Sequence, residues 1–313
     1  MMYMGIDTSA YITSLAIVDG DKQVIWEVRR ILEVPLGERG LLQSETLFQH
    51  IINLPILVSK VPSNLWNKIE GIGVSVAPKN VEGSCMPAST AGYAVASALA
   101  SSLRKRLVQT SHQEGHLAAG IELSSADIGE NFLAVHLSGR TTELLEVKKE
   151  YPGKYDIELL GGTTDLHAGQ FVDRVGVRLG LKFPSGKELE KLALKASPGS
   201  ASLLPSSVKG YEVSFSEAEA VAKRLFEQNK GYANIARAVE GCIVRTVVKL
   251  LEKGIQDTGL TQVILVGGVA SNKYIRSEIQ KKLIKKAEVS WASQDWSTDN
   301  AIGIALLTRE NCK

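Results

Sequence analysis

The chain has 313 residues, 44% of them hydrophobic and 22% charged, with a formal net charge of +2. This is the composition of an ordinary globular protein whose hydrophobic core is large enough to be stable without disulfides or a structural metal. A net charge this small does not by itself indicate a nucleic-acid partner. The three cysteines are scattered and form no CxxC pair, so no disulfide framework is expected. The sequence has no secretory signal pattern and no apolar run long enough to span a membrane, which predicts a soluble, cytoplasmic protein.

The first half of the chain opens with three predicted strands. An apolar segment from Tyr3 is interrupted by the polar turn Asp7-Thr8-Ser9 and resumes to Asp19, where Asp19-Gly20-Asp21 gives a hairpin signal before a third strand at 23–29. These strands are expected to pair in antiparallel order. The later elements of this half are a helix from near Ser44 that Pro55 should kink or divide, a buried strand at 71–76 and a helix at 89–103.

The order strand, polar turn, strand, turn, strand recurs at residues 131–160. A strand at 131–137 ends in Ser138-Gly139-Arg140-Thr141-Thr142, and two further strands follow at 142–147 and 155–160. The later elements are helices at 168–179, 186–196, 216–228 and 232–253, a buried strand at 262–266, a helix from near Asn272, a short strand at 289–292 and a closing helix at 299–307.

This recurrence predicts an α/β fold made of two similar lobes with mixed sheets and a central cleft, residues 1–111 and 112–313. Such a plan resembles the actin-like fold shared by actin, sugar kinases and the heat-shock chaperone ATPases. The alternative is a pair of unrelated α/β domains.

Three turns have the residue types that bind anions. Asp7-Thr8-Ser9 and the turn from Ser138 to Thr142 occupy matching places in the two halves, and backbone N–H groups and hydroxyls in such turns can face phosphate oxygens. In the third turn a buried strand ends in Gly267-Gly268, which allows close approach of a ligand, and Asn272 follows at a helix start where it could bind a sugar or base. Ordinary hairpin or packing turns are the alternative reading.

Histidines at positions 112 and 116 have the spacing of metal ligands. Residues four apart share one face of a helix, so the two imidazoles can converge on one ion, with Asp299 at a helix start as the candidate third ligand. The zinc-protease motif HExxH is not matched, because Gln113 stands at its second position and Glu114 projects away from the histidines. The alternative is two histidines on a solvated or packed helix.

Asp173 and the turn Phe183-Pro184-Ser185-Gly186 are the remaining candidates for nucleotide contact. Asp173 lies one turn beyond Gly169 on a predicted helix, where it could bind a ribose hydroxyl or support the metal. The turn could lie against an adenine. A surface pair between Asp173 and Arg174 is the alternative.

In their order along the chain these motifs resemble the TsaD family, the tRNA adenosine threonylcarbamoyltransferases formerly described as glycoproteases of peptidase family M22. The resemblance runs from Met4 to Leu307. The matching segments are Gly5-Ile6-Asp7-Thr8-Ser9, His112-x-Glu114-Gly115-His116, Ser138-Gly139 with Thr141, Gly169 with Phe171-x-Asp173 and Leu179-Gly180-Leu181, Gly267-Gly268-Val269-Ala270 with Asn272, and Thr298-Asp299-Asn300.

The resemblance implies an actin-like fold and a divalent metal, iron or zinc, bound by His112, His116 and Asp299. It also implies an adenine nucleotide (ATP, AMP or the threonylcarbamoyl adenylate) bound by Ser138, Gly139, Asp173, Gly186 and Asn272. To that set the residues themselves add Arg140 and Gly268. The implied reaction transfers threonylcarbamoyl from its AMP anhydride to N6 of adenosine 37 in tRNAs that read ANN codons. No residue is assigned as a catalytic acid or base.

The implied partners are tRNA, a smaller paralogue that dimerises with the chain, an ATPase and the enzyme that makes the adenylate; a homodimer is the alternative to the paralogue. Two basic clusters, 104–106 and 281–286, could contact phosphates or form solvated helix faces.

The chain departs from the family pattern around the substrate site. Arg140 replaces a glycine of the Ser-Gly-Gly turn, so it either blocks close approach or binds phosphate itself. The other departures are Ala10-Tyr11-Ile12-Thr13 for a Cys-Asp-Glu-Thr run, Ala77-Pro78-Lys79 for Gly-Pro-Gly, Gln170 for glutamate, and 215–220 for Phe-Ser-Gly-Leu-Lys-Thr. The second hypothesis is therefore a divergent paralogue that binds nucleotide and metal, as a regulatory pseudoenzyme or a carbamoyl transferase for another acceptor. A metallopeptidase is disfavoured by the failed motif.

Overall fold

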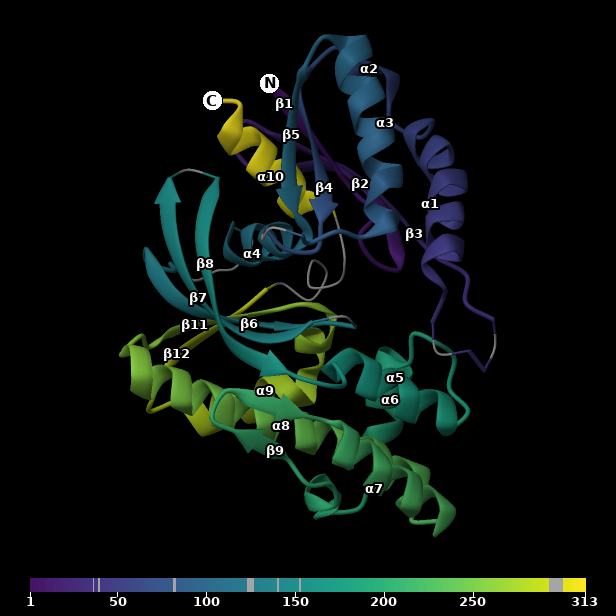
Figure 1. The fold of residues 1–313 in the computed structure, drawn as a ribbon, viewed down its shortest axis with the longest axis vertical. Coiled ribbons are helices and arrows are strands. Elements are labelled where there is room, and N and C mark those ends of the chain that lie inside the picture. The colour runs from purple at the N-terminus through teal and green to yellow at the C-terminus, as the bar shows by residue number, and fades with distance from the viewer. Residues whose placement is uncertain are drawn as a thin grey trace.

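Two mixed β-sheets with helices on both sides build the molecule (Figure 1). This computed structural model describes residues 1–35, 37–38, 40–80, 83–122, 127–139, 141–151, 153–292 and 301–313. The first sheet has the order β3-β2-β1-β4-β5 and the second the order β9-β10-β8-β7-β6-β11-β12. Apart from β9 and β10 the two orders match strand for strand, so the second lobe repeats the plan of the first.

The elements of the first sheet and its helices are β1 (Met2–Asp7), β2 (Ile12–Asp19), β3 (Val24–Ile31), α1 (Gln43–Val58), α2 (Ser63–Trp66), β4 (Ile69–Ala77), α3 (Pro87–Leu103), β5 (Arg106–Ser111) and α4 (His112–Glu122). The elements that follow are β6 (Asn131–Leu137), β7 (Thr142–Tyr151), β8 (Lys154–Thr163), α5 (Ala168–Arg178), α6 (Gly186–Ala193), β9 (Ser207–Lys209), β10 (Glu212–Ser214), α7 (Ser216–Glu227), α8 (Tyr232–Thr258), β11 (Gln262–Val266), α9 (Lys273–Leu283), β12 (Glu288–Trp291) and α10 (Ile302–Asn311).

The predicted antiparallel opening is confirmed in both lobes. β1, β2 and β3 pair antiparallel, as do β6, β7 and β8, and the next strand in each lobe, β4 or β11, pairs in parallel with the first. Polar turns break the buried strands of each lobe at the same place, which is why the repeat is visible in the sequence. The Asp7 turn and the Ser138 turn are therefore topological equivalents.

Several elements differ from the sequence-based expectation, and the short elements α2, β9 and β10 were not predicted. α1 continues through Pro55 to Val58, and because the proline lies close to the C-terminal end it does not divide the helix. β5 was not predicted, because Arg106 and Gln109 interrupt its apolar pattern and only two of its six residues are buried. The predicted lobe boundary falls where β5 meets α4.

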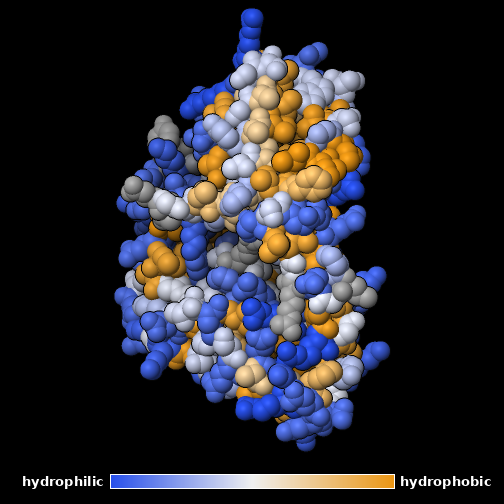
Figure 2. Space-filling view, turned by 45° about the vertical axis from the view of Figure 1, so that its right-hand side comes forward, coloured by the Kyte–Doolittle hydropathy of each residue, from blue (hydrophilic) through white to orange (hydrophobic). Residues whose placement is uncertain are grey.

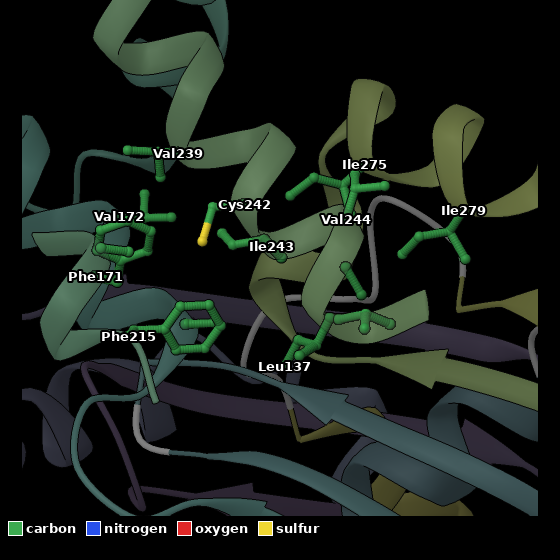
Figure 3. Close-up of a cluster of buried hydrophobic side chains, with 14 of the residues drawn as sticks. Leu137, Phe171, Val172, Phe215, Val239, Cys242, Ile243, Val244, Ile275 and Ile279 are labelled. Carbon is green, nitrogen blue, oxygen red and sulfur yellow. The ribbon is translucent and has the colours of Figure 1, made fainter. Parts of the chain in front are cut away.

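Helices and sheets alternate in layers (Figure 1). α1 and α3 pack on the outer face of the first sheet and α10 on its inner face, while α4 packs on the inner face of the second sheet. The largest buried cluster joins the outer face of the second sheet to α5, α8 and α9, with Phe171, Phe215 and Ile243 among its side chains (Figure 3). Within the described residues, no helix is both long and apolar enough to cross a membrane.

α4 and α10 touch each other between the two sheets. A Cβ placed on Gly303 would lie 1.8 Å from the carbonyl oxygen of Gly115, so the two backbones meet where neither residue has a side chain. The last helix, α10, thereby packs directly against α4, which carries His112 and His116. The contact between α4 and α10 therefore sets the distance of α4 from the first sheet.

Candidate functional site

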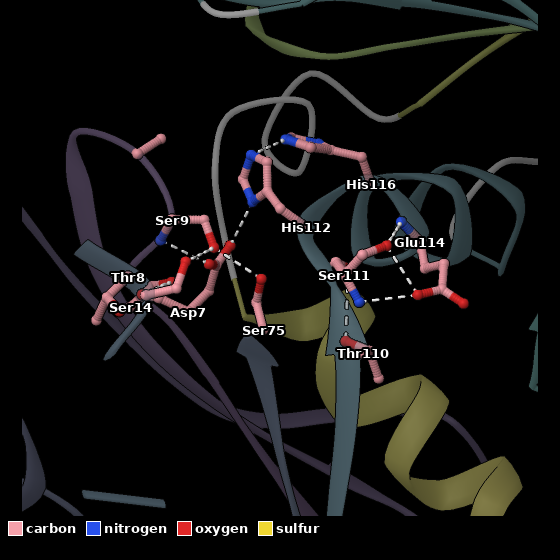
Figure 4. A network of polar contacts seen from close by, with 12 residues as sticks. Asp7, Thr8, Ser9, Ser14, Ser75, Thr110, Ser111, His112, Glu114 and His116 are labelled. Carbon is pink, nitrogen blue, oxygen red and sulfur yellow. Dashed lines mark hydrogen bonds and ion pairs between the residues drawn. The ribbon is translucent and has the colours of Figure 1, made fainter. Parts of the chain in front are cut away.

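Asp7 lies at the end of β1 and faces the paired histidines. One oxygen of its carboxylate accepts a hydrogen bond from the Ser9 amide at 2.9 Å, and the other accepts from His112 Nδ1 at 2.8 Å (Figure 4). Asp7 is 2% exposed. A buried carboxylate that holds the Nδ1 proton of an imidazole leaves the lone pair on Nε2, which is the form that binds a metal.

The hydroxyls of the Asp7 turn have partners inside the first lobe. Thr8 Oγ1 donates to the carbonyl oxygen of Ala88 at 3.0 Å, and Ser9 Oγ lies 2.7 Å from Ser75 Oγ. Both residues are fully or almost fully buried. This turn therefore presents a carboxylate to α4 rather than hydroxyls to a phosphate.

His112 and His116 point their Nε2 atoms toward one another. These atoms are 3.1 Å apart, and the rings stand at 83° to each other. Two nitrogens bound tetrahedrally to one ion at about 2.05 Å would be roughly 3.3 Å apart, so the observed spacing fits a shared ion with little movement. Glu114 is not part of this pair, because its carboxylate accepts from the amide and hydroxyl of Ser111, each at 2.8 Å.

The third predicted ligand, Asp299, lies outside the described residues, as does Arg140. Within the described part of the chain no three metal-ligating side chains gather around one point. Two imidazoles backed by a carboxylate suit zinc or iron rather than magnesium or calcium, which prefer oxygen ligands.

His136 is a neighbour that the sequence analysis missed. It is 1% exposed on β6, with its ring centroid 4.7 Å from that of His116 and 6.4 Å from that of His112. The sequence feature that could have identified it is a single histidine in an otherwise apolar strand, two residues before Ser138. Asp7 was missed as a partner of His112 because the two residues are 105 positions apart and no periodic pattern connects them.

The Ser138–Gly139 turn is pressed against the start of α5. The amide of Gly169 donates to the Ser138 carbonyl oxygen at 3.0 Å, and a Cβ on Gly169 would lie 2.6 Å from the Gly139 amide nitrogen. Only glycine permits this approach. The amides at the start of α5 are thus paired within the protein, Ala168 with Thr142 Oγ1 and Gly169 with the Ser138 carbonyl oxygen, and these bonds fix the turn against the helix.

Asp173 anchors the Phe183–Gly186 turn to α5. Its Oδ1 accepts from the Ser185 amide at 2.6 Å. Burial raises the pKa of Asp173 to about 6, and the Ser185 hydrogen bond only partly offsets this. Gly186 is exposed at the start of α6. The surface pair with Arg174 is wrong as an account of Asp173, because Arg174 pairs with Glu219 instead.

Gly267 and Gly268 lie beside the second lobe's first strand. Gly267 has φ +96°, and a Cβ there would lie 2.4 Å from the Leu137 carbonyl oxygen and 3.0 Å from the His136 ring. The glycine loop therefore neighbours both the Ser138 turn and the imidazole beside His116.

Asn272 has two structural partners. Its Oδ1 accepts from the Ile275 amide at 2.9 Å and caps α9, while its Nδ2 donates to Glu240 at 2.7 Å. The side chain keeps one N–H for a ligand. Glu240 is 1% exposed, and burial raises its pKa to about 7 although Asn272 and Arg237 oppose the shift.

A cavity of about 590 Å³ lies elsewhere, between the ends of β4 and β5 and the β7–β8 hairpin. It is lined by residues such as Lys79, Gln109, Glu114 and Asp156, and by none of the residues predicted for the site. The geometry of donors and turns, rather than cavity volume, locates the candidate site.

Comparison with known proteins agrees with the motif order. The family model of TsaD, tRNA N6-adenosine threonylcarbamoyltransferase, matches residues 49–306. The enzyme of that name from Thermotoga neapolitana is 27% identical, covering 100% of this chain and 95% of its own. One from Thermus thermophilus is 29% identical, covering 98% and 91%.

Solved structures agree with the fold. The Acidaminococcus fermentans (R)-2-hydroxyglutaryl-CoA dehydratase component A has a TM-score of 0.60 at 14% identity, covering 100% of this chain and 99% of its own. A ROK family glucokinase from Streptomyces griseus has a TM-score of 0.53 at 13% identity, with 99% of each chain covered. The actin-like fold is thus confirmed, and the chain belongs to the TsaD family of tRNA N6-adenosine threonylcarbamoyltransferases, enzymes of the acyltransferase type.

Proposed function

We propose that this protein transfers a threonylcarbamoyl group from its AMP anhydride to N6 of adenosine 37 in tRNAs that read ANN codons. The observation that carries the proposal is the arrangement of Asp7, His112 and His116, in which a buried carboxylate orients one imidazole and the two Nε2 atoms lie 3.1 Å apart. Family membership supplies the substrate class.

His112, His116 and Asp299 are the residues proposed to hold the metal, iron or zinc. An ion held there would supply Lewis-acid polarisation of the carbonyl of the transferred group and would stabilise negative charge on its oxygen. Asp7 keeps the proton of His112 on Nδ1 and so keeps Nε2 available as a ligand.

Ser138, Gly139, Arg140, Asp173, Gly186, Gly268 and Asn272 are proposed to bind the adenine nucleotide. The close approach of Gly169 holds the Ser138–Gly139 turn in a fixed position, and this supports the turn itself as the phosphate contact. The Phe183–Gly186 turn, anchored by Asp173, is proposed to lie against the base. In two structures of this fold, a glucokinase and an activator of a 2-hydroxyisocaproyl-CoA dehydratase, ATP analogues are bound.

The partners proposed are tRNA, a smaller paralogue of the family and an ATPase, with a homodimer as the alternative to the paralogue, all in the cytoplasm. An apolar face on the first lobe supports a protein partner. Hydrophobic residues gather over the part of the molecule where α1 and α3 lie (Figure 2). The exposed large hydrophobic residues of these helices are Phe48, Ile51, Ile52, Ile56 and Tyr93.

Complementation tests the transfer. The chain is expressed in a strain that lacks the endogenous transferase, and tRNA is analysed for threonylcarbamoyladenosine; His112→Ala, expressed equally well, is the negative control. Restored modification is expected. If modification stays absent while the purified protein binds AMP and metal, the divergent paralogue is correct. If the protein binds neither, both hypotheses fail.

A further inference from the structure

An ionic contact joins the two lobes at Glu143, at the start of β7. Its carboxylate accepts from Lys79 Nζ, which follows β4 of the first lobe, and from Gln113 Nε2 at 3.0 Å. Glu143 is 7% exposed, whereas the Lys79 side chain is 34% exposed. A buried carboxylate that loses its cation is strongly destabilised, so this contact resists separation of the lobes.

An aromatic contact joins the lobes at a second place. Tyr11, in the turn between β1 and β2, meets Phe183 of the second lobe edge to face, with ring centroids 5.0 Å apart. The Tyr11 hydroxyl oxygen accepts from the Leu41 amide at 3.3 Å, and its carbonyl oxygen accepts from the Leu32 amide at 2.9 Å. Tyr11 is therefore fixed to its own lobe before it reaches the other.

Both contacts lie on the segments that form the candidate site. Tyr11 follows Asp7 by four residues, and Gln113 directly follows His112. On the other side, Phe183 belongs to the turn that Asp173 anchors through Ser185. Separation of the lobes would therefore displace the Asp7 turn from the nucleotide-binding turns of the second lobe.

We propose that Tyr11 and Lys79 are positioning residues, two clasps that hold the lobes closed and align Asp7 with the turns around Asp173 and Ser138. The inference rests on the proposed function for the identity of the ligand. The clasps differ in physical character, since the Lys79 contact is ionic and screened by salt, whereas the Tyr11 contact is not.

The full-length variants for the test are Tyr11→Ala, Lys79→Met and the double variant. Matched controls remove a similar contact within one lobe: Tyr232→Ala, whose ring stacks on Phe226 at 5.5 Å, and Lys105→Met, whose Nζ lies 2.9 Å from Glu70. Amide hydrogen exchange is measured for residues 8–13 and 183–186, together with stopped-flow binding of a fluorescent AMP analogue.

In the double variant we expect exchange in these segments to rise about tenfold, and the association and dissociation rate constants of the analogue to rise together about threefold. Salt at about 0.5 M should accelerate exchange further in Tyr11→Ala but not in the double variant. Exchange and binding rates equal to those of the controls would overturn the proposal.

Tyr11→Phe separates the ring contact from the hydroxyl tether. It retains the edge-to-face pair and should exchange like the wild type; exchange as fast as in Tyr11→Ala would refute a ring clasp. Failure of the proposed function is distinguishable, because a wild-type protein that binds no AMP analogue still reports on the clasps through hydrogen exchange.

Discussion

At Asp7 the first buried strand ends in a carboxylate that reaches the first residue of α4. The same residue type at the surface would be solvated and would orient nothing, but here the carboxylate is enclosed and fixes the proton of His112. Glu240, on α8 of the second lobe, is likewise a buried carboxylate and accepts hydrogen bonds from Asn272 and Arg237. Each of these carboxylates fixes the orientation of another polar side chain.

His112→Ala should lower metal affinity by about tenfold or more, because it removes a ligand, and Asp7→Asn should lower it by a smaller factor, because it only loosens the imidazole. Zinc and cobalt(II) titrations measure the affinities, and the cobalt absorption spectrum reports on the ligand set. His167→Gln, which changes a histidine outside the pair, is the control. Equal metal affinity in the wild type and the three variants would contradict the proposed metal site.

Glu240 should make stability depend on pH. Its folded pKa of about 7 lies above the ordinary value of 4.5, so the native state binds more protons than the unfolded chain between these values. The free energy of unfolding should therefore fall as pH rises from about 5 to about 7.5, by about 2 kcal/mol from this residue. Urea denaturation of the wild type and Glu240→Gln measures this, and the variant should show the shallower slope. Identical slopes would contradict the assignment.

At the scale of elements, α4 is the structural centre of the candidate site. It carries both histidines, one face packs on the second sheet, and Gly115 meets Gly303 of α10. The histidine spacing could be read from the sequence because helix periodicity is local. The helix crossing could not, since it joins residues that are far apart along the chain.

Gly303→Ala should destabilise the protein by about 2 kcal/mol, because the added Cβ would overlap the Gly115 carbonyl and force the two helices apart. The same shift should weaken metal binding. Thermal unfolding and cobalt titration measure both effects. Gly20→Ala, at a position where a Cβ meets nothing within 4 Å, is the control and should behave like the wild type. An unchanged melting temperature in Gly303→Ala would contradict the crossing.

At the scale of the whole molecule, the duplicated sheets place one half of the candidate site on each lobe. Asp7 comes from the first lobe, and the Ser138 turn, Asp173 and the Gly267–Gly268 loop come from the second. Two departures from the family pattern, Tyr11 and Lys79, supply two of the contacts between the lobes. A ligand that touches both lobes should therefore stabilise the entire chain.

AMP at roughly 100 times its Kd, with zinc present, should raise Tm by about 4 °C. Differential scanning fluorimetry over an AMP series measures the shift, with adenosine for comparison. A larger shift in Arg140→Gly would show that the arginine obstructs the turn, and a smaller one that it binds phosphate. No shift for the wild type at any concentration would contradict nucleotide binding.

The sequence by itself determined the repeated strand order, the equivalence of the two polar turns, the histidine spacing and the family, because each depends on residues that are close together or on motifs in a fixed order. Only the tertiary structure decided that Asp7 orients His112, that His136 lies against His116, that Asn272 is held by Glu240, and that Tyr11 and Lys79 reach the other lobe. These contacts are set by how two sheets and the helices between them pack, and side-chain direction across such an interface leaves no periodic signal in the chain. The proposed roles of Asp299 and Arg140, which lie beyond the described residues, stay predictions from sequence.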